Sequence, residues 1–196
     1  MNRQILLLRD IYDNNKATQR ALCKSTGLAL GTVNTLIKEA ISDGYIVQDS
    51  KKGYELSETG RERLKPYKVD CALIMAAGFG SRFVPLSFEK PKGLLEVLGE
   101  PMVERQIRQL KEAGIDDIAI VVGYMKEKFE YLTDKFGVKL IYNPDYASRN
   151  NIGSIEYAYD YLYGRNAYIL SSDNWIRNNM YHSYEPWAWY SAKHAD

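Results

Sequence analysis

The stretch LIMAAGFGSRFVPLSFEKPKG, residues 73–93, passes from an apolar run into a loop that is rich in glycine and basic side chains. Gly78 and Gly80 allow the backbone to approach a ligand closely and to direct amide N–H groups towards it. Further donors and positive charge come from Ser81, Arg82 and Lys92. The loop is not a Walker A loop, and Phe83 stands where the dinucleotide pattern G-x-G-x-x-G has its third glycine. The sequence therefore predicts a loop that holds phosphate groups.

Strands and helices alternate around this loop. Residues 69–77 are typical of a central parallel strand, and residues 101–114 have proline near the start of a predicted helix and glycine just past its end. A strand, a helix and two more strands are predicted over residues 116–123, 126–137, 138–143 and 167–173. This alternation predicts an α/β fold with a doubly wound, mostly parallel, Rossmann-like sheet, which binds ligands at the carboxyl ends of its strands. Gly78 and Asp173 follow two such ends.

The segment before the last predicted strand is ambiguous by pattern alone. Every second residue is a tyrosine at Tyr157, Tyr159, Tyr161 and Tyr163, and this alternation favours a strand. A crossover between parallel strands usually contains a helix, however. For this topological reason we predict a helix.

Residues 3–65 have a different pattern. A first helix is predicted from apolar spacing, a second begins after Thr18 and ends at Gly27, and a β-hairpin and a closing helix complete the segment. Between them lies a third helix, whose predicted apolar stripe is Leu30, Val33, Ile37 and Ile41. The order of these elements resembles the winged helix-turn-helix domains of bacterial regulators.

Such a domain binds DNA through its third helix and its hairpin, or wing. The predicted base-contacting residues are Thr32, Asn34, Thr35 and Lys38, and Lys51 and Lys52 at the wing tip are predicted to contact phosphate. A dimer is expected, because residues 1–65 carry only 11 Lys/Arg against 8 Asp/Glu, a net charge of +3. The alternative is a protein-contact module with an ordinary solvated turn at the wing.

The chain of 196 residues is long enough for two domains, which we place at residues 1–66 and 67–196. Its longest apolar run is far shorter than the roughly 20 residues that span a bilayer, and the N-terminus lacks a signal-peptide pattern, so no membrane partner is expected. Cys23 and Cys71 fall in different domains and within apolar patterns, which indicates reduced thiols and favours the cytoplasm.

The loop and the sequence after it resemble a known family. The pattern AAGFGSRFVPL followed by EKPKG is similar to the signature of nucleotidyltransferases that join a nucleoside triphosphate to a phosphorylated sugar or alcohol. The similarity continues in order through KPKGLLEVLGEPMVERQIRQL, VVGYMKEKFEYL, YNPDYASRNNIGSI and SSDN. Among the subfamilies, residues 70–196 most resemble the bacterial CTP:phosphocholine cytidylyltransferases.

The resemblance implies a role for each matching position. Ala76, Ala77, Gly78, Gly80 and Ser81 would surround the nucleotide, and Asn150, Asn151 and Ser154 would lie near the base and ribose. Arg82 and Lys92 would bind the triphosphate and act in catalysis, and Asp173 would hold Mg²⁺. The less specific interpretations are surface positions for Arg82 and Lys92, and an N-cap of a following helix for Asp173. Aromatic residues from Trp175 to Tyr190 would form either a cage for a quaternary ammonium or ordinary packing.

Whole domains of the resembled family continue past the position of Asp196 through strands that supply a second metal-binding acid and part of the acceptor pocket. We therefore expect a C-terminally truncated domain, either a fragment or a shortened and inactive form. The expected function is Mg²⁺-dependent synthesis of CDP-choline from CTP and phosphocholine, or from a related phosphorylated acceptor. The alternative is a transcriptional regulator whose transferase-like domain senses a nucleotide or a choline metabolite.

Overall fold

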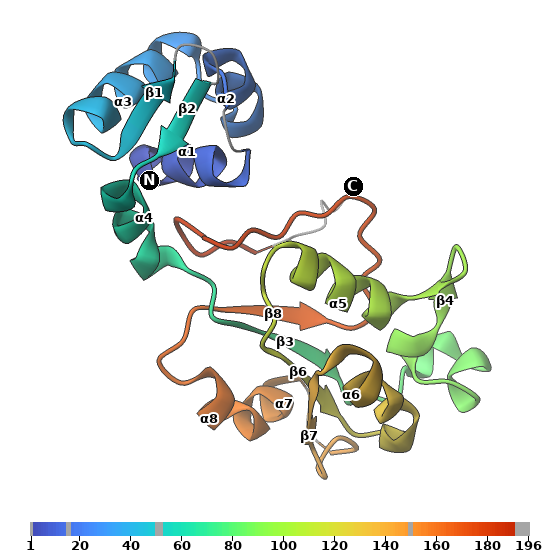
Figure 1. Cartoon of the computed structure of the whole chain (residues 1–196). Coiled ribbons are helices and arrows are strands. Elements are labelled where there is room, and N and C mark those ends of the chain that lie inside the picture. The colour runs from blue at the N-terminus through green and yellow to red at the C-terminus, as the bar shows by residue number, and fades with distance from the viewer. Residues whose placement is uncertain (1, 15–16, 50–52, 149–150, 191–196) are drawn as a thin grey trace. The chain divides into compact units, whose positions relative to one another are not determined.

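The computed structural model describes residues 2–14, 17–49, 53–148 and 151–190 (Figure 1). The chain divides into two compact units. One unit contains Met1–Lys68 together with the chain from Tyr184 onward, and the other contains Val69–Ser183. The chain therefore passes from one unit to the other twice, after Lys68 and after Ser183.

The first unit is a winged helix-turn-helix domain, as predicted. Its elements are α1 (Arg3–Asp13), α2 (Gln19–Thr26), α3 (Leu30–Ser42), β1 (Ile46–Asp49), β2 (Gly53–Leu56), α4 (Glu58–Leu64) and the 3₁₀-helix η1 (Lys65–Tyr67). Strands β1 and β2 pair in antiparallel fashion and form the predicted hairpin. The Thr18 hydroxyl caps α2 by accepting from the Ala21 N–H, and Gly27 ends α2 in the left-handed conformation, as predicted.

One detail of α3 differs from the prediction. Val33 and Ile37 are buried, but Leu30 and Ile41 are 54% and 41% exposed. A step of four residues advances about 40° around an α-helix beyond a full turn, so Ile41 has rotated away from the side on which Val33 lies. Ala40, three residues after Ile37, stays on that side and is fully buried.

The second unit contains a four-stranded parallel sheet in the order β7-β6-β3-β8. Its strands are β3 (Cys71–Ala76), β6 (Ile118–Val122), β7 (Lys139–Tyr142) and β8 (Ala167–Ser171). In register, Ile74 of β3 lies opposite Ile120 of β6 and Leu170 of β8. The loop after β3 contains the 3₁₀-helices η2 (Ser81–Phe83), η3 (Leu86–Phe88) and η4 (Lys92–Leu94), followed by a small hairpin of β4 (Glu96–Val97) and β5 (Glu100–Pro101).

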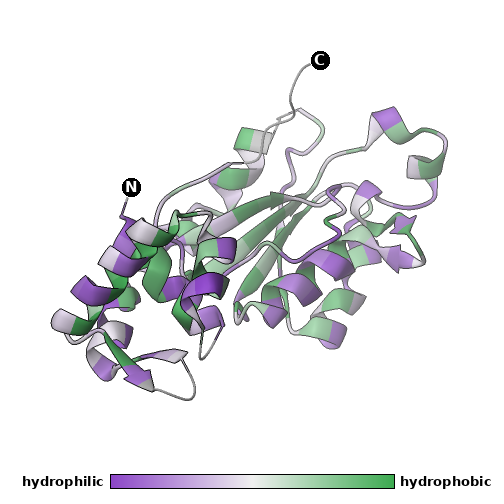
Figure 2. Cartoon of the chain, turned by 90° about the horizontal axis from the view of Figure 1, so that it is seen from above, coloured by the Kyte–Doolittle hydropathy of each residue, from purple (hydrophilic) through white to green (hydrophobic). Residues whose placement is uncertain are grey.

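Helices cover both faces of this sheet, which confirms the doubly wound architecture (Figure 1). Helices α5 (Met102–Glu112) and α6 (Tyr131–Phe136), with η5 (Lys126–Phe129), pack on the face that carries Ile74 and Ile120. Helices α7 (Asn151–Tyr157) and α8 (Tyr159–Leu162) cover the face that carries Leu73 and Val121. Because both faces of the central strands are buried, β3 and β6 are apolar along most of their length (Figure 2).

The predicted crossover helix before β8 is confirmed as α7 and α8. The alternating tyrosines that favoured a strand instead divide between the buried and the exposed sides of this helical segment. Tyr161 packs towards the sheet, and its hydroxyl donates to the Asp117 carbonyl oxygen at 2.9 Å. Tyr159 and Tyr163, which are four residues apart, place their ring centroids 5.5 Å from each other and are largely exposed.

The strand order fixes where a ligand site is expected. From β3 the chain proceeds to β6 and then to β7 on one side, and it returns to β8 on the other side of β3. The carboxyl ends of β3 and β8 therefore flank the topological switch point, where open α/β sheets bind ligands.

Cys23 and Cys71 are free thiols, as predicted. Burial raises the pKa of the Cys71 thiol. None of the helices formed by the described residues has the length and apolar character needed to cross a membrane.

Candidate functional site

The glycine-rich loop begins at the carboxyl end of β3. Ala76 and Ala77 are buried, and the Ala77 carbonyl oxygen accepts a hydrogen bond from the Tyr124 N–H at 3.0 Å. Gly80 has a φ of +64°, and a Cβ at this position would lie 3.2 Å from the Cβ of Lys92. The loop therefore folds back, so that its start packs against its end.

A second close approach joins the end of the loop to the end of β8. A Cβ on Gly93 would lie 2.8 Å from the Cβ of Ser172 and 2.9 Å from its hydroxyl oxygen, distances that real Cβ atoms do not adopt. Only glycine lets the two segments meet here without displacement. This contact places Lys92 beside Asp173.

Lys92 and Asp173 form an ion pair between Nζ and Oδ2. Their side chains are 16% and 22% exposed, and the Ser171 hydroxyl donates to Oδ1 of the same carboxylate. Burial acts to raise the pKa of Asp173, but the hydrogen bonds from Lys92 and Ser171, together with the Lys92 charge, outweigh it and hold the pKa below the usual aspartate value. The carboxylate is therefore ionised at neutral pH.

The N-cap interpretation of Asp173 is wrong for the described part of the chain. Residues 174–190 form turns and extended segments, and none of them is helical. Asp173 instead lies in a turn directly after β8, with its carboxylate occupied by Lys92 and Ser171.

Arg82, the other loop cation predicted to bind the triphosphate, is differently placed. Ser81 and Arg82 are exposed at the start of η2, and Arg82 forms no ion pair with any residue that the structure describes. Lys92 lies 4.8 Å from the ring centroid of Phe83, the residue after Arg82. The guanidinium of Arg82 is therefore available to an anion from solvent, whereas Lys92 is already paired.

Two of the residues predicted near the base and ribose, Asn151 and Ser154, belong to α7. Asn150 lies outside the described residues, and Asn151 is the first residue of α7. Ser154 is buried, and its hydroxyl oxygen accepts from Nδ2 of the fully buried Asn143 at 3.1 Å. The structure therefore joins Ser154 to the turn after β7 and not to the Lys92–Asp173 pair.

Three aromatic rings that the sequence analysis did not identify lie at the carboxyl ends of the strands. The ring of Phe79 lies 5.1 Å from that of Tyr124 and 5.2 Å from that of Tyr146. Phe79 is nevertheless 45% exposed, so the group presents an apolar surface next to the glycine loop. Trp175, one of the aromatic residues for which a cage or ordinary packing was expected, has its ring centroid 4.7 Å from the Arg105 guanidinium carbon.

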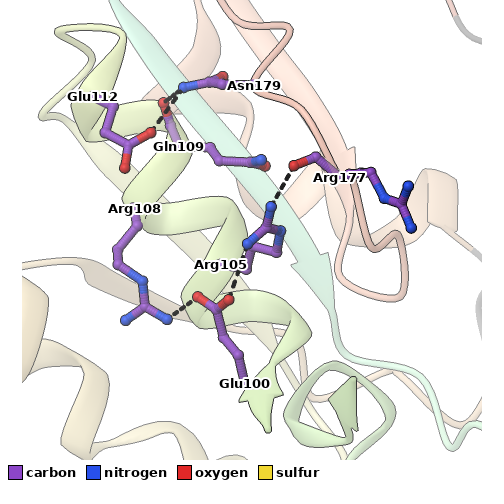
Figure 3. Close-up of a pocket in the computed structure, with 7 residues that line it drawn as sticks. All are labelled: Glu100, Arg105, Arg108, Gln109, Glu112, Arg177 and Asn179. Atoms are coloured by element: carbon purple, nitrogen blue, oxygen red, sulfur yellow. Dashed lines mark hydrogen bonds and ion pairs between the residues drawn. The ribbon is translucent and has the colours of Figure 1, made fainter. Parts of the chain in front are cut away.

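A separate hollow of about 150 Å³ lies beside α5 (Figure 3). Its lining is polar and charged, and consists of Glu100, Arg105, Arg108, Gln109, Glu112, Arg177 and Asn179. Glu100 forms ion pairs with both Arg105 and Arg108. None of the predicted site residues lines this hollow, so it is distinct from the site at the switch point.

The donor set of the site suits a metal ion that arrives with a nucleotide. Among the described residues there is no group of three or more metal-binding side chains. Mg²⁺ commonly uses one or two carboxylates, several waters and substrate phosphates, so a single ionised Asp173 with its remaining oxygen lone pairs fits such an ion. An ion held entirely by the described protein side chains does not fit.

The predicted DNA-contacting residues fall into two groups. Thr35 and Lys38 are exposed on α3, and Thr32 and Asn34 are partly exposed, all away from the buried side of the helix. Lys51 and Lys52 lie outside the described residues.

Two parts of the chain match known families. Residues 72–179 match the MobA-like NTP transferase domain, and residues 2–47 match the winged helix-turn-helix DNA-binding domain. These matches confirm the predicted order of the two domains.

Several relatives match part of this chain. The choline-phosphate cytidylyltransferase of Streptococcus pneumoniae is 44% identical over 110 residues, which cover 56% of this chain and 47% of that protein. The 2-aminoethylphosphonate cytidylyltransferase of Lancefieldella rimae is 42% identical over 116 residues, which cover 59% and 46% of the two proteins. The solved structure of CTP:phosphocholine cytidylyltransferase from Streptococcus pneumoniae has a TM-score of 0.56 and covers 59% of this chain and 50% of that chain. The chain spans about half the length of these relatives.

Proposed function

Since the chain belongs to the family of MobA-like NTP transferase domains, we propose that it transfers a cytidylyl group from CTP to a small phosphorylated acceptor, with phosphocholine as the first candidate. The observation that carries this proposal is the Lys92–Asp173 ion pair beside a glycine-rich loop at the switch point of the sheet. A cation for phosphate and a carboxylate for a divalent ion are the two charges that nucleotidyl transfer requires.

In the proposed reaction, a phosphate oxygen of the acceptor attacks the α-phosphorus of CTP. The new P–O bond forms while the bond from the α-phosphorus to the bridging oxygen breaks, and pyrophosphate leaves with that electron pair. Lys92 and Arg82 bind the triphosphate and stabilise the charge that moves onto pyrophosphate. Asp173 would hold Mg²⁺ that arrives with the triphosphate, and the ion would supply charge neutralisation and orientation there.

The nucleotide itself is proposed to lie along the loop. The backbone from Ala76 to Gly80 and the hydroxyl of Ser81 surround the phosphates and ribose. Asn150, Asn151 and Ser154 are proposed to lie near the base and ribose. Ser154 is buried and accepts a hydrogen bond from Asn143, so its proposed role is to support this part of the site from the protein interior.

The names of two relatives support a class of acceptor. These two cytidylyltransferases are named for choline phosphate and 2-aminoethylphosphonate, which both carry a phosphoryl acid and an amine or ammonium group. We therefore propose a small zwitterionic phosphoryl amine as the acceptor, and not a sugar 1-phosphate.

The test is pyrophosphate release by the purified chain with CTP and Mg²⁺, comparing phosphocholine, phosphoethanolamine, 2-aminoethylphosphonate and glucose 1-phosphate. We expect release with an amine-containing acceptor and formation of the matching CDP product. Release only with glucose 1-phosphate would exclude the proposed acceptor class. An absence of release in every mixture would exclude cytidylyl transfer by this chain.

The winged helix supports a second proposed function, which is binding of DNA through α3 and the wing, with the protein as a dimer on a two-fold symmetric site. If nucleotide binds without pyrophosphate release, the alternative is a regulator whose transferase-like unit senses a nucleotide or a choline metabolite. A change in DNA affinity on addition of CTP or phosphocholine, in the absence of turnover, would support that alternative.

A further inference from the structure

Gln106 is a polar residue on the apolar side of α5. Val103, Ile107 and Leu110 share that side and are fully buried in the core of the second unit. Gln106 is itself only 1% exposed. Because a glutamine side chain is rarely buried without hydrogen-bond partners, its contacts indicate what it is for.

The side-chain amide of Gln106 contacts the backbone on both sides of Asp173. Its Nε2 donates to the Ser171 carbonyl oxygen at 2.9 Å and to the Asn174 carbonyl oxygen at 2.7 Å. Ser171 ends β8, and its hydroxyl also donates to the Asp173 carboxylate. One NH₂ group therefore fixes both ends of the turn that carries the proposed metal-binding carboxylate.

The other end of the same amide has no such role. Oε1 of Gln106 is buried and has no hydrogen-bond partner among the residues that the structure describes. A buried acceptor without a partner costs stability, so a hydrocarbon side chain would serve packing better at this position. The glutamine is therefore explained by its two N–H contacts and not by packing.

We propose that Gln106 is a positioning residue that sets the direction of the Asp173 carboxylate for the ion that accompanies the triphosphate. This inference rests on the proposed function, in which Asp173 holds that ion. Residues that orient a metal ligand typically change metal affinity about 10- to 100-fold when they are removed. Gln106 would act in this way through the backbone of the turn, without contact to metal or nucleotide.

Gln109 provides a matched control on the same helix. It is 4% exposed, its Nε2 donates to the Ile176 carbonyl oxygen at 2.9 Å, and its Oε1 also lacks a partner among the described residues. Figure 3 shows Gln109 beside Arg105, whose guanidinium donates to the Arg177 carbonyl oxygen. Gln109 thus holds the same segment of chain, but beyond the turn that carries Asp173.

The experiment measures the CTP dissociation constant of the full chain with Mg²⁺ and with EDTA. The dissociation constant in EDTA divided by that in Mg²⁺ is the metal-dependent gain in affinity. We expect Gln106→Met to lower this gain about tenfold or more while the affinity in EDTA stays close to wild type. Gln109→Met is expected to keep the gain. A merely structural role of Gln106 would weaken binding in both conditions and would not change the ratio.

A double-mutant cycle completes the test. Asp173→Asn should abolish the gain, and adding Gln106→Met to it should have no further effect on the ratio, because both changes act on one contact. Gln106→Leu serves if the methionine variant does not fold. A wild-type gain in Gln106→Met, or an equal loss in Gln109→Met, would overturn the positioning role alone. If the wild-type chain binds CTP with no metal-dependent gain, or fails to bind CTP, the proposed role of Asp173 falls and the inference falls with it.

Discussion

The Nζ of Lys92 is paired with the carboxylate of Asp173, although the two residues belong to segments far apart in the sequence. Gly93 makes this pairing possible through its close approach to Ser172. In the proposed function Lys92 binds phosphate and Asp173 binds the metal ion, and in this pair each side chain neutralises the charge of the other. A bound triphosphate with its divalent ion would offer each of these side chains a new partner of opposite charge.

Lys92→Ala and Arg82→Ala should each weaken binding of CTP more than binding of CMP. Each variant would remove the proposed charge-assisted hydrogen bonds to the outer phosphates, which are worth about 1.5–3 kcal/mol, or about 10- to 150-fold in affinity. Lys90→Ala is the matched control, because Lys90 lies in the same loop but is exposed and pairs with Glu96. Calorimetric titrations with both nucleotides check the prediction, and equal losses for CTP and CMP would place these side chains away from the outer phosphates.

Gly93→Ala should destabilise the second unit and disturb the Lys92–Asp173 pair. The added methyl group would lie 2.8 Å from the Cβ of Ser172, and overpacking of this kind typically costs about 1–3 kcal/mol. Gly78→Ala is the control for stability, since a Cβ there meets no atom within 4 Å. Urea unfolding measures both variants. A wild-type unfolding midpoint for Gly93→Ala would mean that the two segments are not in close contact.

The stability of the second unit should depend on the ionisation of Asp117. Burial acts to raise the pKa of this carboxyl, but hydrogen bonds from Arg165 at 2.6 Å and Lys139 at 3.0 Å outweigh it and lower the pKa. The native pKa then lies below the unfolded value of about 3.9. The stabilisation is therefore present above that unfolded value and is lost as the pH falls through the native pKa.

The corresponding variant is Asp117→Asn. Its free energy of unfolding should fall most below that of wild type near neutral pH, and the difference should shrink as the pH is lowered from about 5 to about 3. Asp116→Asn, at an exposed carboxylate 3.7 Å from Lys111, should show little difference at any pH. A constant difference between Asp117→Asn and wild type across this range would show that the ion pairs do not stabilise the fold.

In the winged helix, substitutions in the two groups of proposed DNA-contacting residues should change DNA binding in different ways. Replacing Lys51 and Lys52 with alanine should weaken binding to all sequences and reduce the salt dependence by about one unit per lost phosphate contact. Asn34→Ala should relax sequence preference and leave the salt dependence unchanged. Fluorescence anisotropy with the full chain, at several salt concentrations, separates the two outcomes. A lack of salt-sensitive binding to any duplex would leave the domain as a protein-contact module.

Much of the fold could be predicted from the sequence, because local signals agree with the tertiary structure. Thr18 and Gly27 mark the ends of α2 by capping chemistry, and alternating strands and helices predict the doubly wound sheet. The predictions were weaker where several residues could face the core. On α3 the buried residue is Ala40 and not Ile41. The sequence pattern favoured Ile41, because a small side chain such as that of Ala40 gives only a weak apolar signal.

Other features depend on contacts between distant segments and give little local signal. The return of the chain to the first unit is one case, in which Glu185 pairs with Arg9 at 3.4 Å and the ring of Tyr184 lies 4.9 Å from that of Tyr12. Gln106 is different, since a polar residue between Val103 and Ile107 on an apolar helical side is visible in the sequence. Its partners, however, are backbone carbonyls after β8, and only the fold brings them within reach.

The central claim is that the glycine-rich loop, Lys92 and Asp173 form one site for a nucleoside triphosphate with its divalent ion. The most direct measurement is calorimetric titration of the purified chain with CTP and with CMP, each in Mg²⁺ and in EDTA. We predict that CTP binds at least about tenfold more tightly than CMP in Mg²⁺, since only CTP carries the outer phosphates that Arg82 and Lys92 are proposed to contact. We also predict that EDTA reduces this difference, because the divalent ion that Asp173 is proposed to hold is then absent. Equal affinities for CTP and CMP in Mg²⁺, or no saturable binding of either nucleotide, would contradict the claim.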